Sequence, residues 1–373
     1  MKKVTISGYK SIGTGEFAQK LELGSINVII GANAAGKSNF ISFFKMLNHI
    51  MTGGLRIFVG RNGSAKNFFH FGEKTTPIIE ASLEFENKNY TNIYNFSLVK
   101  TTDDNLMFSK ESIITQRKSD NSEMKASLGE GYRESCLASE TVNKPYEKVV
   151  KGILSHCRAF QFHDTSDSSH IRSISALDNN RVLMSDGGNL AAYLYMLKNK
   201  SDEYCKYYKR IVNMVRCIFP QFDDFVLAPE MLNENTIKLK WKEKDSPDYE
   251  FGAEQLSDGS IRFIALATLF LQPPELLPNV IIIDEPELGL HPQAIDVLAS
   301  MIKIASQHVQ VIVATQSPRL IDNFEVNNII VAEMDSVYHC TVFKQLCEDT
   351  LKDWLQDYTN SELWEKNIFG GQP

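Results

Sequence analysis

The eight residues GANAAGKS, at positions 31–38, constrain the fold of this chain more than any other stretch. They follow residues 26–30, a nearly all-apolar run of the kind that forms a strand buried on both faces of a parallel sheet. They precede a helical pattern of large apolar residues, Phe40, Phe43, Phe44 and Leu47. The stretch matches G-x-x-x-x-G-K-[ST] in full and in the strand–loop–helix context that this pattern requires. It therefore predicts a loop whose backbone N–H groups cradle phosphates at a helix N-terminus.

The pattern assigns separate tasks to its two last residues. Lys37 is expected to reach the β- and γ-phosphates of a triphosphate, and Ser38 to ligate Mg²⁺. The alternative is a glycine turn that caps an ordinary helix. The predicted nucleotide-binding residues of the loop are Gly31, Ala32, Asn33, Ala34, Ala35, Gly36, Lys37, Ser38 and Asn39.

A pair of acids follows an apolar run in the last third of the chain. VIIIDEPELGLHP, residues 280–292, contains Asp284 and Glu285 directly after four β-branched residues. Ligands bind at the carboxyl ends of strands in open α/β sheets. Asp284 is expected to hold Mg²⁺ through an oxygen or a water, and Glu285 to polarise the attacking water as general base. The alternative is an acidic strand end followed by a turn.

VQVIVATQSPRL, residues 309–320, repeats this logic. If its strand neighbours that of Asp284, Gln316 lies beside the γ-phosphate and joins the catalytic set. As an amide, Gln316 can orient water or phosphate but cannot act as a base at neutral pH. A plain exit from strand to turn is the alternative.

AFQFHDTSDSS, residues 159–169, crowds polar side chains after an apolar approach. This cluster can contact Mg²⁺ or the lytic water, with Gln161 as the metal candidate, or it can start a capped helix. His163 and Asp164 alone do not make a zinc site, which needs three or four ligands.

The remaining patterns predict the architecture. Alternating runs over residues 78–114 indicate an antiparallel meander, and the polar residues 116–143 a mobile loop. Apolar residues at three- and four-residue spacing over residues 189–219 indicate helices, closed by Pro220. The last third alternates helix and strand, as a parallel sheet covered by helices does.

We therefore expect an α/β protein with a mixed sheet core, an antiparallel β subdomain and a small helical subdomain. Residues 1–160 are expected to form an N-terminal lobe with the phosphate loop and the meander. Residues 161–250 are expected to form a helical insertion and return strand, and residues 251–373 a C-terminal lobe.

TIKLKWKEK, residues 236–244, alternates lysine with apolar residues, so a strand here presents its lysines on one face. One interpretation is a solvated edge strand protected by charge. The other is a stripe that follows the phosphates of DNA. The lysines are Lys238, Lys240, Lys242 and Lys244.

The composition limits the partners and the cellular location that the chain can have. The chain has 373 residues and a formal net charge of −7, which argues against a surface that is basic throughout but allows a local positive groove. Its six cysteines include no CxxC pair, and no run approaches the roughly 18 apolar residues of a membrane span. We expect a soluble, cytoplasmic protein without a membrane partner. No HNH-like metal cluster is apparent in the sequence.

Taken together, these motifs resemble the ABC-type ATPases of the SMC, RecF and overcoming-lysogenization-defect (OLD) kind. More narrowly, the chain is similar to arm-less bacterial "AAA family ATPases", many of which are linked to anti-phage defence. The likeness runs over nearly the whole chain. It rests on ISGYKSIGTG, GANAAGKSN, FQFHDTS, LSDGSIR, DEPELGLHP, ATQS and LWEKNIFGGQP. Two departures are Ala34, where a glycine is usual, and Gln316, where transport ATPases carry a histidine.

The resemblance identifies LSDGS, residues 256–260, as the signature motif of ABC ATPases, which contacts a nucleotide held by another subunit. Ser257 and the amides near Gly259 can hold a γ-phosphate at a helix N-terminus. The alternative is that Ser257 or Asp258 only caps that helix. The signature implies a head-to-tail homodimer joined by ATP.

The resemblance also implies ATP and Mg²⁺ as cofactors and hydrolysis of ATP to ADP and phosphate. The expected function is an ATPase that controls a separately encoded effector, a Toprim-like or HNH-like nuclease, in anti-phage defence. An ATP-gated DNA-binding clamp or scaffold in DNA repair or maintenance is the alternative. A nucleotide-binding subunit of a transporter is disfavoured by Asn39 and by the meander.

Overall fold

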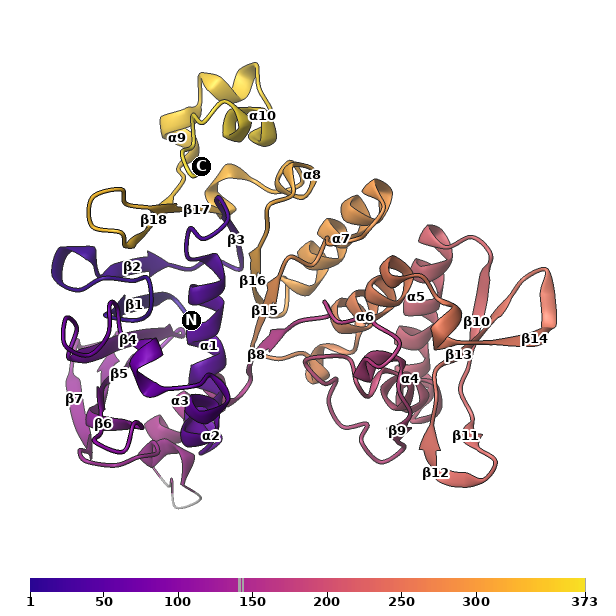
Figure 1. Ribbon diagram of the computed structural model, residues 1–373, viewed down its shortest axis with the longest axis horizontal. Helices are drawn as coiled ribbons and strands as arrows, with labels where there is room; N and C mark the ends of the chain where they lie inside the picture. The colour runs from indigo at the N-terminus through magenta and orange to yellow at the C-terminus, as the bar shows by residue number, and fades with distance from the viewer. Residues whose placement is uncertain (140–141, 143, 373) are drawn as a thin grey trace. The chain divides into compact units, whose positions relative to one another are not determined.

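The computed structural model of the chain describes residues 1–372 except 140, 141 and 143 (Figure 1). The chain forms two compact units, each built from separate stretches of sequence. The first comprises Met1–Arg158, Asn279–Ile282 and Glu325–Pro373, and the second comprises Ala159–Pro278 and Ile283–Phe324. The expected mixed α/β architecture is confirmed, whereas the boundaries at residues 160 and 250 stay a prediction.

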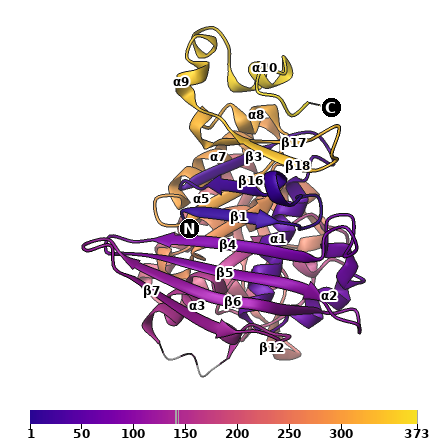
Figure 2. The same ribbon diagram turned by 90° about the vertical axis from the view of Figure 1, so that its left-hand side faces the viewer.

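The first unit contains the predicted antiparallel meander. Its sheet has the order β2-β1-β4-β5-β6-β7, and Figure 2 shows these strands side by side. Side chains alternate between buried and exposed along β4, so one face of the sheet belongs to the core. The bounds are β1 Lys3–Ser7, β2 Gln19–Glu22, β4 Ile78–Glu86, β5 Tyr90–Lys100, β6 Leu106–Arg117 and β7 Glu123–Gly129.

Helix α1 (Lys37–Met51) covers the buried face of this sheet. Phe43 of α1 stacks on Phe96 of β5, with ring centroids 6.4 Å apart. Phe40, Phe44 and Leu47 are buried as well, as the helical spacing predicts. The remaining helices of the first unit are α2 Leu55–Arg61, α3 Pro145–Ser155, α9 Glu348–Leu351 and α10 Asn360–Glu365.

Strand β3 (Ile26–Ile30) leads into the phosphate loop, and all five of its residues are buried. It pairs in parallel with β17 (Ile329–Met334), which pairs antiparallel with β18 (Thr341–Gln345). The predicted strand over residues 26–30 is therefore confirmed. Burial on both faces explains why its sequence has no polar alternation.

The second unit is centred on α6 (Asp258–Leu271), in which every residue from 261 to 271 is buried. A helix that is apolar all round must be covered on all sides, and α6 packs against α5 and α7. The other helices are α4 Leu190–Asn199, α5 Asp202–Ile218, α7 Pro292–Ala305 and α8 Pro318–Ile321. Helices α4 and α5 lie within residues 189–219, where the sequence predicted helices, whereas the short α8 was not predicted.

Six strands of the second unit form two small sheets, in the orders β10-β13-β14 and β11-β12-β9, and the buried strand β16 belongs to neither of them. Two further strands, β8 and β15, have residues in both units. The bounds are β8 Cys157–Phe160, β9 Ser175–Ala176, β10 Phe222–Val226, β11 Pro229–Glu230, β12 Asn233–Ile237, β13 Lys240–Glu243, β14 Ser246–Gly252, β15 Val280–Asp284 and β16 Gln310–Ala314.

The prediction of a mobile loop over residues 116–143 is wrong for much of its length. Strand β7 lies within it and pairs with β6, with Ala126 opposite Ile113. The neighbouring strand β6 supplies the hydrogen bonds that this polar segment cannot form within itself. The local sequence pattern does not predict this pairing. Residues 140, 141 and 143 of the expected loop lie outside the described residues.

The prediction of one continuous strand over residues 236–244 is also wrong. Strand β12 ends at Ile237 and β13 begins at Lys240, because the chain passes there from one small sheet to the other. Lys238 pairs with Glu254 and Lys240 with Glu230, each at 3.2 Å. These ion pairs weigh against a DNA-binding stripe. The interpretation as an edge strand is also wrong for β13, which lies between β10 and β14 in its sheet.

No helix among the described residues is both long and apolar enough to cross a membrane.

Candidate functional site

The phosphate loop joins β3 to α1 in the first unit, and its backbone excludes larger residues at both terminal glycines. Gly31 has φ 149° and Gly36 has φ 101°. A Cβ on Gly36 would lie 2.0 Å from Thr341 Oγ1, and one on Gly31 would lie 2.2 Å from Ala332 O. β17 and β18 therefore support the loop from behind, where only glycine fits.

Lys37 is turned into its own loop. Its side chain is buried, and Nζ donates to Gly31 O at 2.6 Å and to Ala32 O at 2.9 Å. A buried cation at the start of a 15-residue helix is an arrangement that suits polyphosphate, since helix dipole and ammonium both favour negative charge. To bind phosphate, Lys37 would have to exchange these carbonyls for phosphate oxygens.

Ala34, the departure from the usual glycine, adopts φ 65°. The left-handed conformation disfavours a residue with Cβ by roughly 1–2 kcal/mol. Ala34 is exposed, so its methyl group meets no steric barrier besides this backbone strain. The structure explains why glycine is usual here and why alanine is tolerated.

In the second unit, the structure brings the catalytic candidates Glu285 and Gln316 together. Gln316 Nε2 donates to Glu285 Oε1 at 3.1 Å, and the backbone N–H of Glu285 donates to Ala314 O at 2.8 Å. Glu285 adopts φ 41°, a strained conformation for a residue with a side chain. The amide of Gln316 thus orients the carboxylate that the sequence assigns as the base.

Glu287 is a residue of this site that the sequence analysis missed. Its Oε1 accepts from Thr315 Oγ1 at 2.5 Å and from Gln316 N at 3.4 Å. Within the described part of the chain, its buried Oε2 has no hydrogen-bond partner. Burial raises the pKa of this carboxyl, and the nearby Glu285 charge acts in the same direction. The sequence signal for Glu287 was its position two residues after Glu285, in E-P-E. That spacing alone does not show a functional role, because the role depends on Thr315 lying close to Glu287 in the fold.

Glu287 predicts a pH dependence of stability. Because its pKa is raised in the folded protein, its stabilising contribution is complete below the ordinary carboxyl pKa and is lost as the pH rises through the raised value. Glu287→Gln keeps the shape and has no charge to bury. We expect the variant's Tm, relative to wild type, to increase as the pH rises from about 4 to about 8.

Thermal unfolding followed by circular dichroism across that range measures this difference. The exposed Glu275→Gln is the control, and its difference from wild type should stay nearly constant. A Tm difference for Glu287→Gln that is flat or falls with pH contradicts the prediction.

The polar cluster after β8 contacts the backbone of Asp284. His163 Nε2 donates to Asp284 O at 2.8 Å, which leaves His163 Nδ1 to accept from Gln161 Nε2 at 3.3 Å. Asp164 Oδ1 accepts from Ser166 N and Oγ in a local turn. The stretch then enters a 3-10 helix of only three residues, His170–Arg172, whose N-cap Ser169 makes no capping hydrogen bond with its side chain, so the alternative of a capped helix start is met only in part. Gln161 and Asp284 are brought close through His163.

The three metal candidates offer hydroxyl, carboxylate and amide oxygens, the hard donors that Mg²⁺ accepts. Ser38 is exposed at the start of α1 in the first unit, and Asp284 and Gln161 belong to the second. The donor chemistry therefore fits Mg²⁺.

The signature residues form the start of α6. Ser257 Oγ accepts from Ser260 N at 3.1 Å, so Ser257 is the N-cap of the helix. A Cβ on Gly259 would lie 2.5 Å from Gly289 O, so this turn of helix packs tightly against the loop after Glu285. Ser257 therefore does cap α6, as the alternative interpretation expected. Ser257 is also exposed at the helix N-terminus, where a phosphate can bind.

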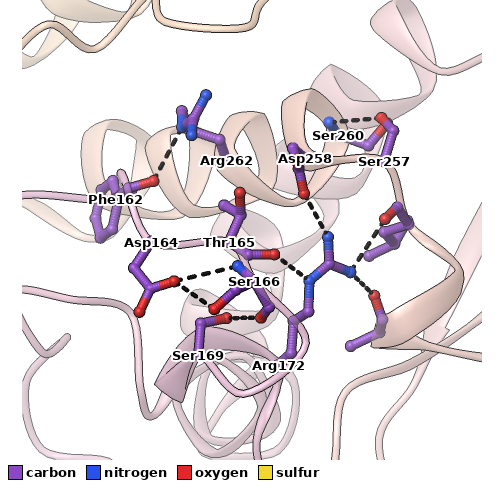
Figure 3. Close-up of polar contacts among 12 residues, drawn as sticks. Phe162, Asp164, Thr165, Ser166, Ser169, Arg172, Ser257, Asp258, Ser260 and Arg262 are labelled. Carbon is purple, nitrogen blue, oxygen red and sulfur yellow. Dashed lines mark hydrogen bonds and ion pairs between the residues drawn. The ribbon is translucent and has the colours of Figure 1, made fainter.

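Two buried arginines hold the signature in place (Figure 3). Arg172 Nε donates to Thr165 O at 2.7 Å, and its Nη2 pairs with Asp258 at 2.9 Å. Arg172 Nη1 also donates to the carbonyls of Ala253 and Leu256. These bonds tie the loop before α6 to the segment after β8.

Arg262, in the first turns of α6, makes a second set of bonds to the segment after β8. Its Nε donates to Phe162 O at 2.9 Å and its Nη2 to His163 O at 3.1 Å, while Nη1 donates to Leu288 O. The signature helix is thereby joined to the polar cluster and to the loop after Glu285. The sequence analysis missed both arginines, although Arg262 stands within LSDGSIR.

A family model described as "AAA domain" matches residues 3–217, and one described as "AAA domain, putative AbiEii toxin, Type IV TA system" matches residues 157–322. Curated protein sequences gave no match.

Solved structures similar to the chain include heads of SMC proteins. An Smc head bound to the C-terminal winged-helix domain of ScpA is 17% identical, with 94% of this chain and 99% of that chain covered and a TM-score of 0.56. An Smc head with an extended coiled coil, bound to the C-terminal domain of ScpA derived from Pyrococcus furiosus, is 15% identical, with 95% and 98% covered and a TM-score of 0.54. These likenesses concern the fold. Because the first family model matches more than half of its length, the chain belongs to the AAA-domain family, and its fold is similar to that of Smc heads.

Proposed function

We propose that two copies of this ATPase bind ATP between them, head to tail, and that hydrolysis of ATP separates them. The observation that carries the proposal is the start of α6, where an exposed Ser257 caps a helix that hydrogen bonds of Arg172 and of its own Arg262 hold in place. Such an end is prepared to receive a phosphate, yet the chain already has a complete phosphate loop. We infer that the start of α6 serves a nucleotide held by a second copy of the chain.

The side chains divide the chemistry. Lys37 leaves its loop carbonyls to bind the β- and γ-phosphates. Ser38, Asp284 and Gln161 are the residues that would hold Mg²⁺. Bound Mg²⁺ neutralises charge on the phosphate oxygens. Glu285 takes a proton from the attacking water, and Gln316 orients this carboxylate. Ser257 and the amides near Gly259 contact the γ-phosphate of the nucleotide held by the other copy.

A cavity of about 470 Å³ in the first unit suits the nucleoside end of ATP. It reaches Asn39, two residues after Lys37, and its walls include Lys10, His70 and the exposed Phe71. Aromatic side chains can stack on a purine, and amide side chains can form hydrogen bonds with its edge. The cavity thus continues from the phosphate loop with the chemistry of a base pocket.

The proposal extends to a partner. We infer that the ATP-bound dimer controls a separately encoded effector, a nuclease of Toprim-like or HNH-like chemistry, in anti-phage defence in the cytoplasm. Support comes from the family description, which includes a putative AbiEii toxin, and from the similar Smc heads, which bind ScpA. ATP acts as a switch because it stabilises the dimer and ADP does not. Glu285→Gln tests hydrolysis, Ser257→Arg tests the shared site, and co-purification with products of adjacent genes tests the effector.

A second function, ATP-gated binding of DNA, is favoured by the exposed face of α5. Lys206, Lys209 and Arg210 lie there on one helical stripe and line an open cavity of about 430 Å³. Among the described residues none of these three is in an ion pair, unlike Lys238 and Lys240. On a chain of net charge −7, three unpaired cations along one face attract a phosphate backbone.

Neutralising this face tests DNA binding. We expect the triple variant Lys206→Gln, Lys209→Gln and Arg210→Gln to bind a labelled DNA duplex more weakly and to lower the slope of log K against log salt by about 2–3. Fluorescence anisotropy at several salt concentrations, with ATP, measures both. Lys238→Gln, Lys240→Gln and Lys242→Gln remove the same charge and should change little. Equal weakening by both variants, or by neither, contradicts a site on α5.

A further inference from the structure

We propose that residues 368–372, IFGGQ, form a strap that positions the phosphate loop for nucleotide, with Gly371 as the positioning residue. This inference rests on the proposed binding of ATP by that loop. The backbone N–H of Ala32, inside the loop, donates to Gly371 O at 2.8 Å. These residues are about 340 positions apart in the sequence and belong to the same unit. The strap therefore bonds directly to the nucleotide-binding loop.

The strap is itself held firmly against β17. Phe369 is buried, with 1% of its surface exposed, and anchors one end. The N–H of Gly371 donates to Glu333 Oε1 at 2.6 Å, and Gln372 Nε2 donates to Trp364 O at 3.2 Å. A carboxylate acceptor makes the bond to Glu333 one of the stronger kind. The Gly371 carbonyl is thus presented to Ala32 from a fixed support.

Both glycines of the strap are required by the backbone. Gly370 has φ 85° and Gly371 has φ 79°. A Cβ on Gly370 would lie 1.8 Å from Glu333 Oε1, and one on Gly371 would lie 2.6 Å from Val331 Cγ1. Any larger residue at either position must displace the strap, because both conformation and space exclude it.

The strap acts on the residues that Lys37 contacts. The carbonyls of Gly31 and Ala32 accept from Lys37 Nζ, while the N–H of Ala32 is bonded to Gly371. When Lys37 moves to phosphate oxygens, those carbonyls lose its ammonium. The bond to Gly371 then keeps the Ala32 peptide in the orientation that the cradle needs. Losing the strap leaves the loop to be ordered at the moment of binding, which lowers affinity.

The experiment compares full-length Gly371→Ala with Gly131→Ala. Gly131 is a matched control because it has φ 80° and a Cβ there meets nothing within 4 Å. We expect Gly371→Ala to raise the Kd for a fluorescent ATP analogue and the KM for ATP about tenfold, with kcat within about twofold of wild type. Gly131→Ala should change neither.

A second variant distinguishes a weakened strap from a misfolded protein. Glu333→Gln keeps the shape but weakens the bond to Gly371 N, so it should shift Kd and KM in the same direction by a smaller factor. Each variant's Tm is measured without nucleotide. A folded Gly371→Ala with wild-type Kd and KM overturns the strap, as does a fall in kcat with KM unchanged. A wild-type protein that binds no ATP instead overturns the proposed function, so the two failures are distinguishable.

Discussion

Replacing Glu285 by glutamine is expected to lower the rate of phosphate release about 10²–10⁴-fold while ATP still binds. The amide matches the shape of the carboxyl and can still accept from Gln316, but it cannot take a proton from water. The affinity for ATP depends on the phosphate loop, which the substitution leaves intact. Unhydrolysed ATP should therefore accumulate in a dimer, detected by size-exclusion chromatography with ATP and Mg²⁺ beside a phosphate-release assay.

Glu275→Gln is the control for the loss of one acidic charge in the same unit. Glu275 is exposed, so its variant should hydrolyse ATP at the wild-type rate. If Glu285→Gln keeps more than about a tenth of wild-type activity, another group acts as the base and the assignment of Glu285 is wrong.

The elements of this fold follow from local patterns wherever burial determines the side chains. The apolar run at residues 26–30 is β3 with the predicted bounds, and the spacing in residues 189–219 yields α4 and α5. In each case one stretch of sequence carries the whole signal, because a buried strand or an amphipathic helix shows its own periodicity.

Predictions failed where a remote partner decides the structure. The chain switches between sheets after Ile237, and the lysine alternation continues across that break without marking it. β7 forms because β6 is available beside it. Neither the pairing partner nor the change of sheet is encoded in a local period of two.

The candidate site shows the same division. The motifs predict Lys37, Glu285 and Ser257 as functional residues, because each motif lies within a single short stretch of sequence. The supports of the site come from elsewhere: Thr315 holds Glu287, and Gly371 holds Ala32. Hydrogen bonds between distant segments require the fold before they can be seen, so a single sequence conceals them.

Ser257→Arg is the second substitution with a large expected effect. It places a long cation on the exposed start of α6, where the proposed partner copy presents its nucleotide. We expect ATP-dependent dimerisation to be lost and hydrolysis to fall to background, while one copy still binds ATP with nearly wild-type affinity. Analytical ultracentrifugation with and without ATP, phosphate release and titration with a fluorescent ATP analogue measure the three properties.

The difficulty in interpreting Ser257→Arg is that Ser257 also caps α6, and the loss of an N-cap costs about 1 kcal/mol of stability. Ser201→Arg resolves it, since Ser201 is the exposed N-cap of α5 and its side chain accepts from Tyr204 N. Both variants lose a cap and gain a cation in the same unit, but only Ser257 belongs to the signature. Ser201→Arg should therefore dimerise and hydrolyse ATP normally despite a similar fall in Tm. If Ser257→Arg hydrolyses ATP as well as Ser201→Arg does, α6 does not contact the nucleotide of another copy, and capping alone accounts for the serine.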